Sequence, residues 1–477
     1  MDRCAHGVVC VFIEAFITRQ GNAMHDTAAT PPPPALTRQL AGFIEATHWT
    51  DLPAAVRHEA RRTLVNYFAV ALAGCGDPDI DKARRLLGRL QPDGQSRVIG
   101  RAERLGMLDA ASLNAMSANV YDFDDTHMPT IIHPTAPVAA ALFAFAETTR
   151  VSGEQLLLAL VMGVEVECRL GMALHPWHYQ RGWHITSTCG VFGAAAAIGK
   201  LLGLDARQLA WALGNASAQA SGLVETLGSA AKSLGVGNAP RNGILSALLA
   251  QDGFAGPERP LEGERGFLRV MGEQPRFTEV SDGLGERWAL AANTYKPYPC
   301  GVVLNPVIEA CLALAQGRDW SLERISHIEL VGHPLLRERT DRPHIRLGRE
   351  SQVSAQHAVA VSLATGKAGL AQFSDAAVAD PALRALYPRL SFIDDPNYAV
   401  EAAEVRLQLD CGRVLSQRVA VARGSLCVPL SDADLENKLH ELAVYGGSGC
   451  AVQPLLDMLW SLDGEEDAGK LMALAVG

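Results

Sequence analysis

The residues of this sequence that could do chemistry are concentrated in one short polar stretch. Residues 121–127 read Tyr-Asp-Phe-Asp-Asp-Thr-His, and a further histidine, His133, follows before a proline. If the preceding small-residue helix continues, Asp122 and Thr126 lie four residues apart on one helical face. Two prolines then force the chain into a loop that leaves His133 beside the helix end. Since an imidazole near a carboxylate titrates close to neutral pH, this pattern predicts an acid–base site.

Other interpretations fit the same stretch. Aspartates at a helix end are often only caps, and carboxylates with two histidines also suit a divalent metal ion. A nucleotide site is weakly supported, because the glycine-rich run 235–240 ends in proline and follows no predicted strand. We therefore expect acid–base chemistry and no bound metal.

Two further polar residues lie beside small-residue segments. His184 immediately precedes an alanine-rich helix, and a helix N-terminus lowers an imidazole's pKa and offers free N–H groups to an anion. Taken alone, His184 is more often a capping or core histidine. Lys232 precedes the glycine-rich stretch 235–243, where small neighbours let it reach a carboxylate, although a solvated lysine is the default.

The segment 293–301, Asn-Thr-Tyr-Lys-Pro-Tyr-Pro-Cys-Gly, forms a rigid aromatic turn at the expected junction of two domains. Clefts between domains are where ligand sites concentrate, so Lys296 is a candidate binding residue. Cys300 has no paired histidine after it and is interpreted as structural. A hydrolase that uses Cys300 is a distant alternative.

The composition excludes several classes of partner. The chain has 477 residues and a formal charge of −10, which argues against nucleic acid or an anionic membrane. Ten cysteines without CxxC pairs suit reduced thiols in the cytoplasm, which is the expected location. The apolar segment 8–17 is interrupted by Glu14, and no signal-peptide cleavage site follows. Met24 is a second candidate start.

Periodicity predicts a mainly α protein, with a large, discontinuous all-helical domain and a smaller α+β lid domain. Alternating residues in 325–331 and 405–421, with a turn at 410–412, indicate strands and a hairpin. Helices are expected at 52–73, 153–170, 191–202, 206–213 (with Asp205 as cap), 354–365, 375–386, 432–445 and 452–462. The expected parts are an extension and proline-rich lead-in at 1–34, the helical domain at 35–295, the lid domain at 296–430, and C-terminal helices at 431–477 that return to the helical domain.

Five motifs, taken in chain order, resemble the MmgE/PrpD family, which includes 2-methylcitrate dehydratase, cis-aconitate decarboxylase and iminodisuccinate epimerase. They are DFDDTH, the following His-Pro-Thr, GWHITST, AAKSLGVGNAPRNG and NTYKPYPCG. The resemblance covers residues 36–460. It implies a homodimer, no organic cofactor, and a pocket between the two domains that takes a small polycarboxylate.

Carried over by position, the resemblance implies four catalytic and two substrate-binding residues. They are Asp122, His133, His184 and Lys232, and then Thr126 and Lys296. Two positions depart from the decarboxylase pattern: Gly301 stands where that enzyme has a histidine, and Arg339 where it has a lid tyrosine. Both departures count against decarboxylation and leave dehydration and epimerisation open.

The chemical step shared by these reactions is removal of a proton next to a carboxylate. The enolate-like anion needs nearby positive charge, and one preorganised donor contributes about 3 kcal/mol. We expect Lys232 and Lys296 to supply that charge, and His133 and His184 to share the acid and base roles. Asp122 would orient one imidazole, and a hydroxyl at position 126 would bind the substrate. The expected function is a hydro-lyase similar to 2-methylcitrate dehydratase, with an epimerase of the iminodisuccinate type or a non-catalytic binding protein on the same fold as alternatives.

Overall fold

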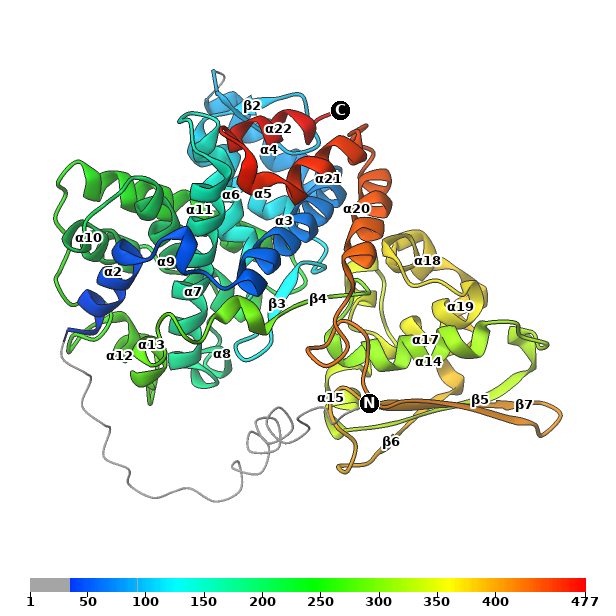
Figure 1. The fold of residues 1–477 in the computed structure, drawn as a ribbon. Coiled ribbons are helices and arrows are strands. Elements are labelled where there is room, and N and C mark those ends of the chain that lie inside the picture. Colours follow the sequence, from blue (N-terminus) through cyan, green and yellow to red (C-terminus); the bar gives the residue numbers. More distant parts are fainter. Residues whose placement is uncertain (1–34, 92) are drawn as a thin grey trace. The chain divides into compact units, whose positions relative to one another are not determined.

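The computed structural model describes residues 35–91 and 93–477 (Figure 1). Helices account for 58% of the structure and strands for 9%, so the prediction of a mainly α protein is confirmed. The division into two domains stays a prediction. The expected extension at 1–34 and the candidate start at Met24 lie outside the described residues. Within the described ranges, no helix combines the length and apolar character needed to cross a membrane.

Helices make up most of the chain from residue 36 to residue 281. The longer ones are α2 (Leu36–Ala46), α3 (Ala54–Gly74), α4 (Pro78–Leu90), α5 (Met107–Asn119), α6 (Thr135–Ala146), α7 (Gly153–Leu174), α9 (Ile185–Leu201), α10 (Ala206–Ser217) and α11 (Ala230–Gln251); the short ones are α8 (Trp177–Gln180), α12 (Phe267–Met271) and α13 (Thr278–Ser281). In the centre, α9 packs against α7 and α11, and α11 also packs against α5. The predicted cap of α10 is confirmed, because the side chain of Asp205 accepts a hydrogen bond from the Gln208 N–H.

The glycine-rich stretch 235–243 is part of α11, and its glycines explain how that helix fits between its neighbours. A methyl group at Gly237 would lie 2.6 Å from Cγ of Met116 on α5. A methyl group at Gly243 would lie 2.5 Å from Cβ of Ala194 on α9. Real side chains do not approach so closely, so both positions require glycine for helix packing rather than for a loop.

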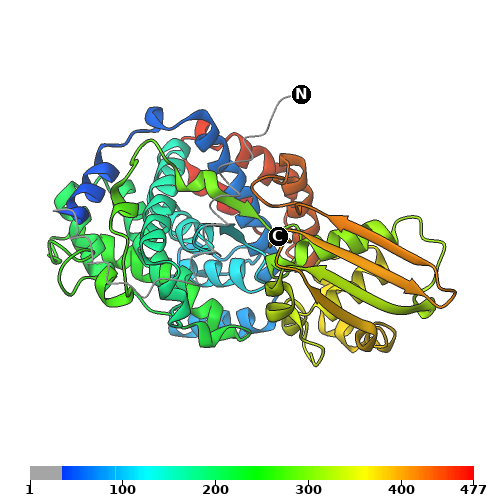
Figure 2. The ribbon, with the colours of Figure 1, turned by 90° about the horizontal axis from the view of Figure 1, so that it is seen from below.

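The α+β region is built on a four-stranded sheet in the order β6-β5-β7-β8 (Figure 2). The strands are β5 (Ile325–Gly332), β6 (Leu390–Asp394), β7 (Ala403–Leu409) and β8 (Val414–Val419). β5 and β6 are parallel, and the other pairs are antiparallel. The predicted hairpin is confirmed: β7 and β8 are joined by a turn in which Gly412 has φ 82°.

Helices accompany this sheet on one side, where α14 packs against β7 and β8 and against α17. The helices of the region are α14 (Asn305–Ala315), α15 (Pro334–Thr340), α16 (Gly348–Ser351), α17 (Ala355–Thr365), α18 (Asp375–Ala379) and α19 (Pro381–Arg384). The prediction of a single helix at 375–386 is wrong, because the structure has two short helices, α18 and α19, in this range. Pro381 has no N–H to continue the first helix, and Asp380 caps a second one instead.

The chain ends in α20 (Asp432–Gly446), α21 (Val452–Trp460) and α22 (Leu471–Leu474), and α20 packs along α3 (Figure 1). Two-stranded pairs complete the fold. They are β1 (Ser96–Arg97) with β2 (Arg104–Leu105), and β3 (Asp125–His127) with β4 (Asn293–Tyr295). The second pair matters most for function, because it joins segments about 170 residues apart. It places the polar stretch 121–127 beside the segment 293–301.

Candidate active site

The polar stretch begins where α5 ends, and its conformation differs from the helix expected there. Asp122 adopts a left-handed backbone conformation with φ 51°, and Thr126 lies in β3. The prediction that these two residues share a helical face is therefore wrong. Pairing with β4 requires extended backbone from residue 125, and a left-handed residue turns the chain out of the helix. Aspartate is one of the few residues that tolerate this conformation.

The carboxylate of Asp122 lies between two ammonium groups. Nζ of Lys232 donates to its Oδ1 at 2.7 Å, and Nζ of Lys296 lies 3.3 Å from Oδ2. Lys296 also donates to the backbone carbonyl of Asp122 at 2.7 Å. Burial alone would raise the pKa of Asp122, but the two lysines and His133 lower it far below its usual value. Asp122 therefore stays ionised and acts as the fixed partner of the two cations.

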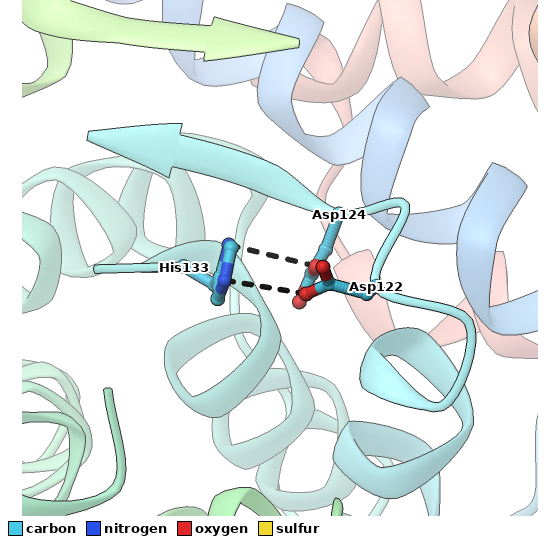
Figure 3. Close-up of side chains that lie close together, drawn as sticks. All are labelled: Asp122, Asp124 and His133. Carbon is cyan, nitrogen blue, oxygen red and sulfur yellow. Dashed lines mark ion pairs between the residues drawn. The ribbon is translucent and has the colours of Figure 1, made fainter. Parts of the chain in front are cut away.

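His133 lies in the loop before α6, as predicted, and its ring faces two carboxylates (Figure 3). Its Nδ1 is 2.7 Å from the backbone carbonyl of Asp125, which assigns the ring proton to that nitrogen. The hydroxyl of Thr126 lies 3.3 Å from the same nitrogen. Nε2 lies 3.6 Å from Oδ1 of Asp122, so this nitrogen is the one free to exchange a proton in the site.

The three aspartates of the motif have different partners. Asp122 pairs with lysines, whereas Asp124 accepts a hydrogen bond from the amide of Asn119 at 2.7 Å. Asp125 accepts one from Asn293 at 2.7 Å, and also from the hydroxyls of Thr63 and Thr135. These contacts connect α3, α6 and β4 through one carboxyl group. Burial, chiefly, raises the pKa of Asp125.

Asp122, Asp124 and His133 offer ligand atoms within 4.8 Å of one another, which is the geometry of a small cation site. Two observations favour an organic anion instead. Both oxygens of Asp122 face lysine ammonium groups, and these repel a divalent cation. Nδ1 of His133 is engaged with a carbonyl and is not available as a ligand.

His184 is the N-cap residue of α9, so its predicted place at a helix N-terminus is confirmed. Its Nδ1 lies 2.7 Å from the hydroxyl of Ser187. The hydroxyl of Thr186 accepts the backbone N–H of His133 at 3.1 Å, which ties the first turn of α9 to the His133 loop. Burial first, and then Lys232 and His133, lower the pKa of His184 to about 3. The imidazole is neutral at physiological pH, and an anion bound beside it would raise its proton affinity.

All six predicted site residues therefore lie in one neighbourhood, although they come from five separate segments of the chain. Their individual roles stay predictions. Two other reactive side chains have structural positions. Cys300 is fully buried, and burial raises its thiol pKa well above the usual value, which disfavours the nucleophilic thiolate. His127 pairs with the hydroxyl of Thr130, and burial lowers its pKa to about 3.

Three neighbours of the site were not singled out from the sequence. Tyr179 interacts electrostatically with Lys232, Asp122 and Arg339. Burial raises the pKa of its hydroxyl. Gln352 donates to the carbonyl of Tyr121 at 2.6 Å. Lys438 donates to the carbonyls of Phe123 and Lys296 at 2.9 and 3.0 Å.

Only Lys438 had a signal in the sequence. It occupies the apolar face of α20 together with Leu435, Leu439 and Leu442, where a lysine is unexpected.

The site as a whole presents fixed positive charge in a mostly buried setting. The side chains of Lys232 and Lys296 are only 10% and 5% exposed, and one carboxylate, Asp122, is shared between them. A small cavity lies beside Lys296 and is lined in part by Thr294 and Asn305. Ammonium groups of this kind stabilise anions more strongly than solvated ones, because little water screens them.

Family models identify the protein class that this fold and site define. Residues 38–280 match the MmgE/PrpD N-terminal domain, and residues 298–462 match the MmgE/PrpD C-terminal domain. The chain belongs to the MmgE/PrpD family. Lys296 lies between the two matched spans, and the other five candidate residues lie in the first.

Individual relatives are similar over nearly their whole length. A cis-aconitate decarboxylase-like protein of Aspergillus oryzae is 28% identical, with 93% of this chain and 97% of the relative covered. The cis-aconitate decarboxylase of Aspergillus terreus is 28% identical, with 90% and 95% covered. That of Mus musculus is 26% identical, with 93% and 94% covered.

Proposed function

We propose that this protein is a lyase that acts on a small polycarboxylic acid by proton transfer next to a carboxylate. The observation that carries the proposal is the carboxylate of Asp122 between the ammonium groups of Lys232 and Lys296, with Nε2 of His133 3.6 Å from it. Lys232 and Lys296 can bind a carboxylate of a polycarboxylic acid beside Asp122. The full-length similarity to cis-aconitate decarboxylases supports the same substrate class.

The chemistry follows from the protonation states of the groups. Removing a proton next to a carboxylate places a second negative charge on that carboxylate. Lys232 stabilises this charge, because its pKa is raised by Asp122 despite burial and it stays protonated. Nε2 of His133 is the nitrogen that accepts the proton, since Nδ1 keeps its own on the Asp125 carbonyl.

Within the lyases, we propose loss of water as the reaction, by analogy with 2-methylcitrate dehydratase. The C–H bond gives its proton to His133, the C–O bond breaks, and the hydroxyl leaves as water after protonation by a second group of the site. A Cβ at Gly301 would meet no atom within 4 Å, so the room for a side chain exists there, but no proton donor occupies it. Arg339 adds a positive charge near Tyr179, beside the site.

Decarboxylation is the second candidate, and it is favoured by the names of the similar proteins rather than by the site. In that reaction the C–C bond to a carboxylate breaks, and the carbanion that remains takes a proton. His133 and His184 are the groups available to deliver it. An epimerase would use the same two groups on opposite faces of one carbon.

A single experiment separates these reactions. The purified protein is incubated in D₂O with 2-methylcitrate, citrate, cis-aconitate and iminodisuccinate, and the products are followed by proton NMR and mass spectrometry. Loss of water with a new alkene supports dehydration, and loss of carbon dioxide supports decarboxylation. Deuterium uptake at constant skeleton supports epimerisation. Binding of these acids with no exchange or turnover in any of them would contradict an enzymatic function.

A further inference from the structure

Three consecutive backbone carbonyls around Asp122 are each held by a side chain from a different, later segment. Gln352 donates to the carbonyl of residue 121 at 2.6 Å, Lys296 to that of residue 122 at 2.7 Å, and Lys438 to that of residue 123 at 2.9 Å. The left-handed conformation of Asp122 lies at the centre of this arrangement. Within the turn, the Asp122 N–H donates to the carbonyl of Asn119 at 3.0 Å, and these three later segments fix the turn from outside as well.

Lys438 is the most unusual of the three donors. Besides the carbonyl of Phe123, its Nζ donates to the carbonyl of Lys296 at 3.0 Å and to Oδ1 of Asn66 at 2.9 Å. It also lies 3.7 Å from the centre of the Phe123 ring. Three acceptors require three N–H hydrogens, which only the ammonium form supplies.

None of these three partners is a carboxylate, and this makes the burial of Lys438 costly. Burial and the like charge of Lys296 lower the pKa of Lys438 well below its ordinary value, and Asp124 and Asp125 partly oppose them. A leucine on this face of α20 would pack among Leu435 and Leu439 without that cost. A buried lysine at such a position indicates a function beyond packing.

The contacts form a closed circuit through the site. The backbone of Lys296 is joined to Nζ of Lys438, which is joined to the carbonyl of Phe123. One residue back, the carbonyl of Asp122 accepts from the ammonium end of the same Lys296. Both ends of Lys296 are thus fixed against the turn that carries the Asp122 carboxylate.

We propose that Lys438 is a positioning residue for the reaction. Its ammonium group connects the backbone of the Asp122 turn to the backbone of Lys296. It thereby determines the positions of the Lys296 ammonium group and the Asp122 carboxylate. This inference rests on the proposed function for its activity readouts. Its structural content, the registration of two segments by one ammonium group, is independent of the reaction.

The first test is Lys438→Met, which keeps the length of the side chain and removes its donors. A misplacement of about 1 Å at a reacting group costs about 100-fold in rate, so kcat should fall by about that factor while KM changes much less. Lys200→Met is the matched control. Lys200 donates to two carbonyls, those of Ile44 and Glu45, at 2.7 and 2.9 Å, and takes part in none of the contacts around Asp122. The Lys200→Met variant should keep the kcat of the wild type.

Three further variants separate positioning from general stability. Lys438→Gln retains donors and should give an intermediate kcat, which keeps the test informative if the methionine variant folds poorly. Lys438→Ala should regain activity when propylammonium is added, because the small cation can occupy the vacated site.

The pH profile of kcat is a further readout. In the wild type, kcat should fall as pH rises and Lys438 loses its third hydrogen, and Lys438→Arg should remove that fall.

The outcomes distinguish the two proposals. An active wild type together with wild-type kcat and pH profile in Lys438→Met and Lys438→Gln would overturn the positioning role and leave the function intact. If the wild type acts on none of the acids, the proposed function fails, and crystal structures of Lys438→Met then decide. Separation of the Phe123 and Lys296 carbonyls with a shifted Asp122 supports the inference, and unchanged geometry overturns it.

Discussion

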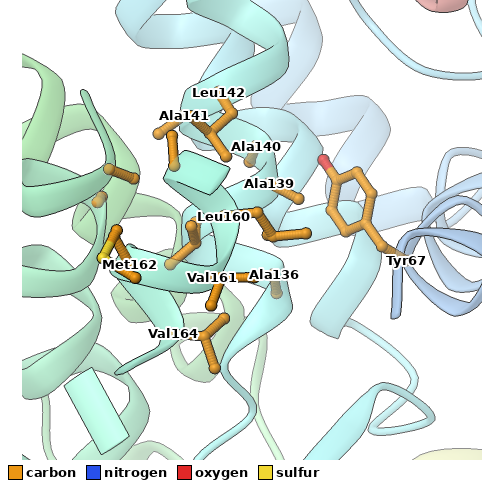
Figure 4. Close-up of a cluster of buried hydrophobic side chains, with 14 of the residues drawn as sticks. Tyr67, Ala136, Ala139, Ala140, Ala141, Leu142, Leu160, Val161, Met162 and Val164 are labelled. Carbon is orange, nitrogen blue, oxygen red and sulfur yellow. The ribbon is translucent and has the colours of Figure 1, made fainter. Parts of the chain in front are cut away.

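In the part of the core around Ala139 and Leu160, the buried side chains are mostly apolar, whereas at the start of α6 burial encloses several charged groups. Figure 4 shows side chains of the first region, among them those of Tyr67, Ala139, Leu160 and Val164. In the second region His133 precedes α6 by two residues and faces Asp122. Apolar contacts are non-directional, so many arrangements satisfy them, but charges in low dielectric depend steeply on distance. Substitutions should therefore cost stability in the first region and activity in the second.

The largest expected effect is that of His133→Ala on activity. Loss of a general acid or base lowers kcat by about 10²- to 10⁴-fold, while the side chain makes few apolar contacts whose loss would unfold the protein. Steady-state kinetics on the best acid of the panel and thermal unfolding measure the two quantities. His357→Gln is the control, because His357 is a buried imidazole bonded to Tyr387 and to the carbonyl of Gln372 in the α+β region. A reversed pattern, with His357 needed for turnover and His133 not, would contradict the site.

The core side of the comparison is tested by Leu160→Ala. Leu160 is fully buried in α7, and removing its side chain leaves a cavity. The free energy of unfolding should fall by about 2–5 kcal/mol. Urea denaturation measures the loss, and kcat of the folded protein should stay within a few-fold of the wild type. A loss of kcat comparable to that of His133→Ala would mean that the two regions are not separable.

The third prediction concerns pH and the neutral imidazole of His184. Its pKa of about 3 in the fold is below the unfolded value of about 6.5, so the unfolded chain binds the proton first. This stability is present above pH 6.5 and is lost as the pH falls towards 3. At pH 5 the loss is about 2 kcal/mol. Urea denaturation at pH 7 and pH 5 should show a smaller difference for His184→Asn than for the wild type. An equal difference would mean that His184 is protonated in the fold.

The smallest expected effect is stabilisation by a bound polycarboxylate. A ligand at 10 times its Kd stabilises the fold by about 1.4 kcal/mol, so citrate or an unreactive tricarboxylate should raise the Tm. Lys232→Met should abolish the shift, because it removes one of the two cations at Asp122. Lys200→Met should retain it. A shift that survives in Lys232→Met would place the anion elsewhere on the protein.

The sequence predicted local features where one residue decides the local energy. Asp205 caps α10, and the turn before β8 needs the left-handed conformation that Gly412 supplies. It failed where a distant segment decides. The helix expected to continue through Asp122 stops because residue 125 pairs with Tyr295, a contact that no local pattern reveals. The apolar face of α20 marks Lys438 as unexpected, but its role was missed because its acceptors lie on three other segments.

The sequence by itself determined that this chain is mainly helical, that it belongs with the MmgE/PrpD proteins, and which six polar residues to examine. Residue types, periodicity and motif order are properties of the sequence itself, so they can be identified without the fold. Only the tertiary structure decided that Asp122 is the fixed counter-ion of two lysines and that His184 is neutral. It also decided that Asp125 connects separate segments through hydrogen bonds. Charge state depends on burial and on neighbours brought from far along the chain, and these exist only once the chain has folded.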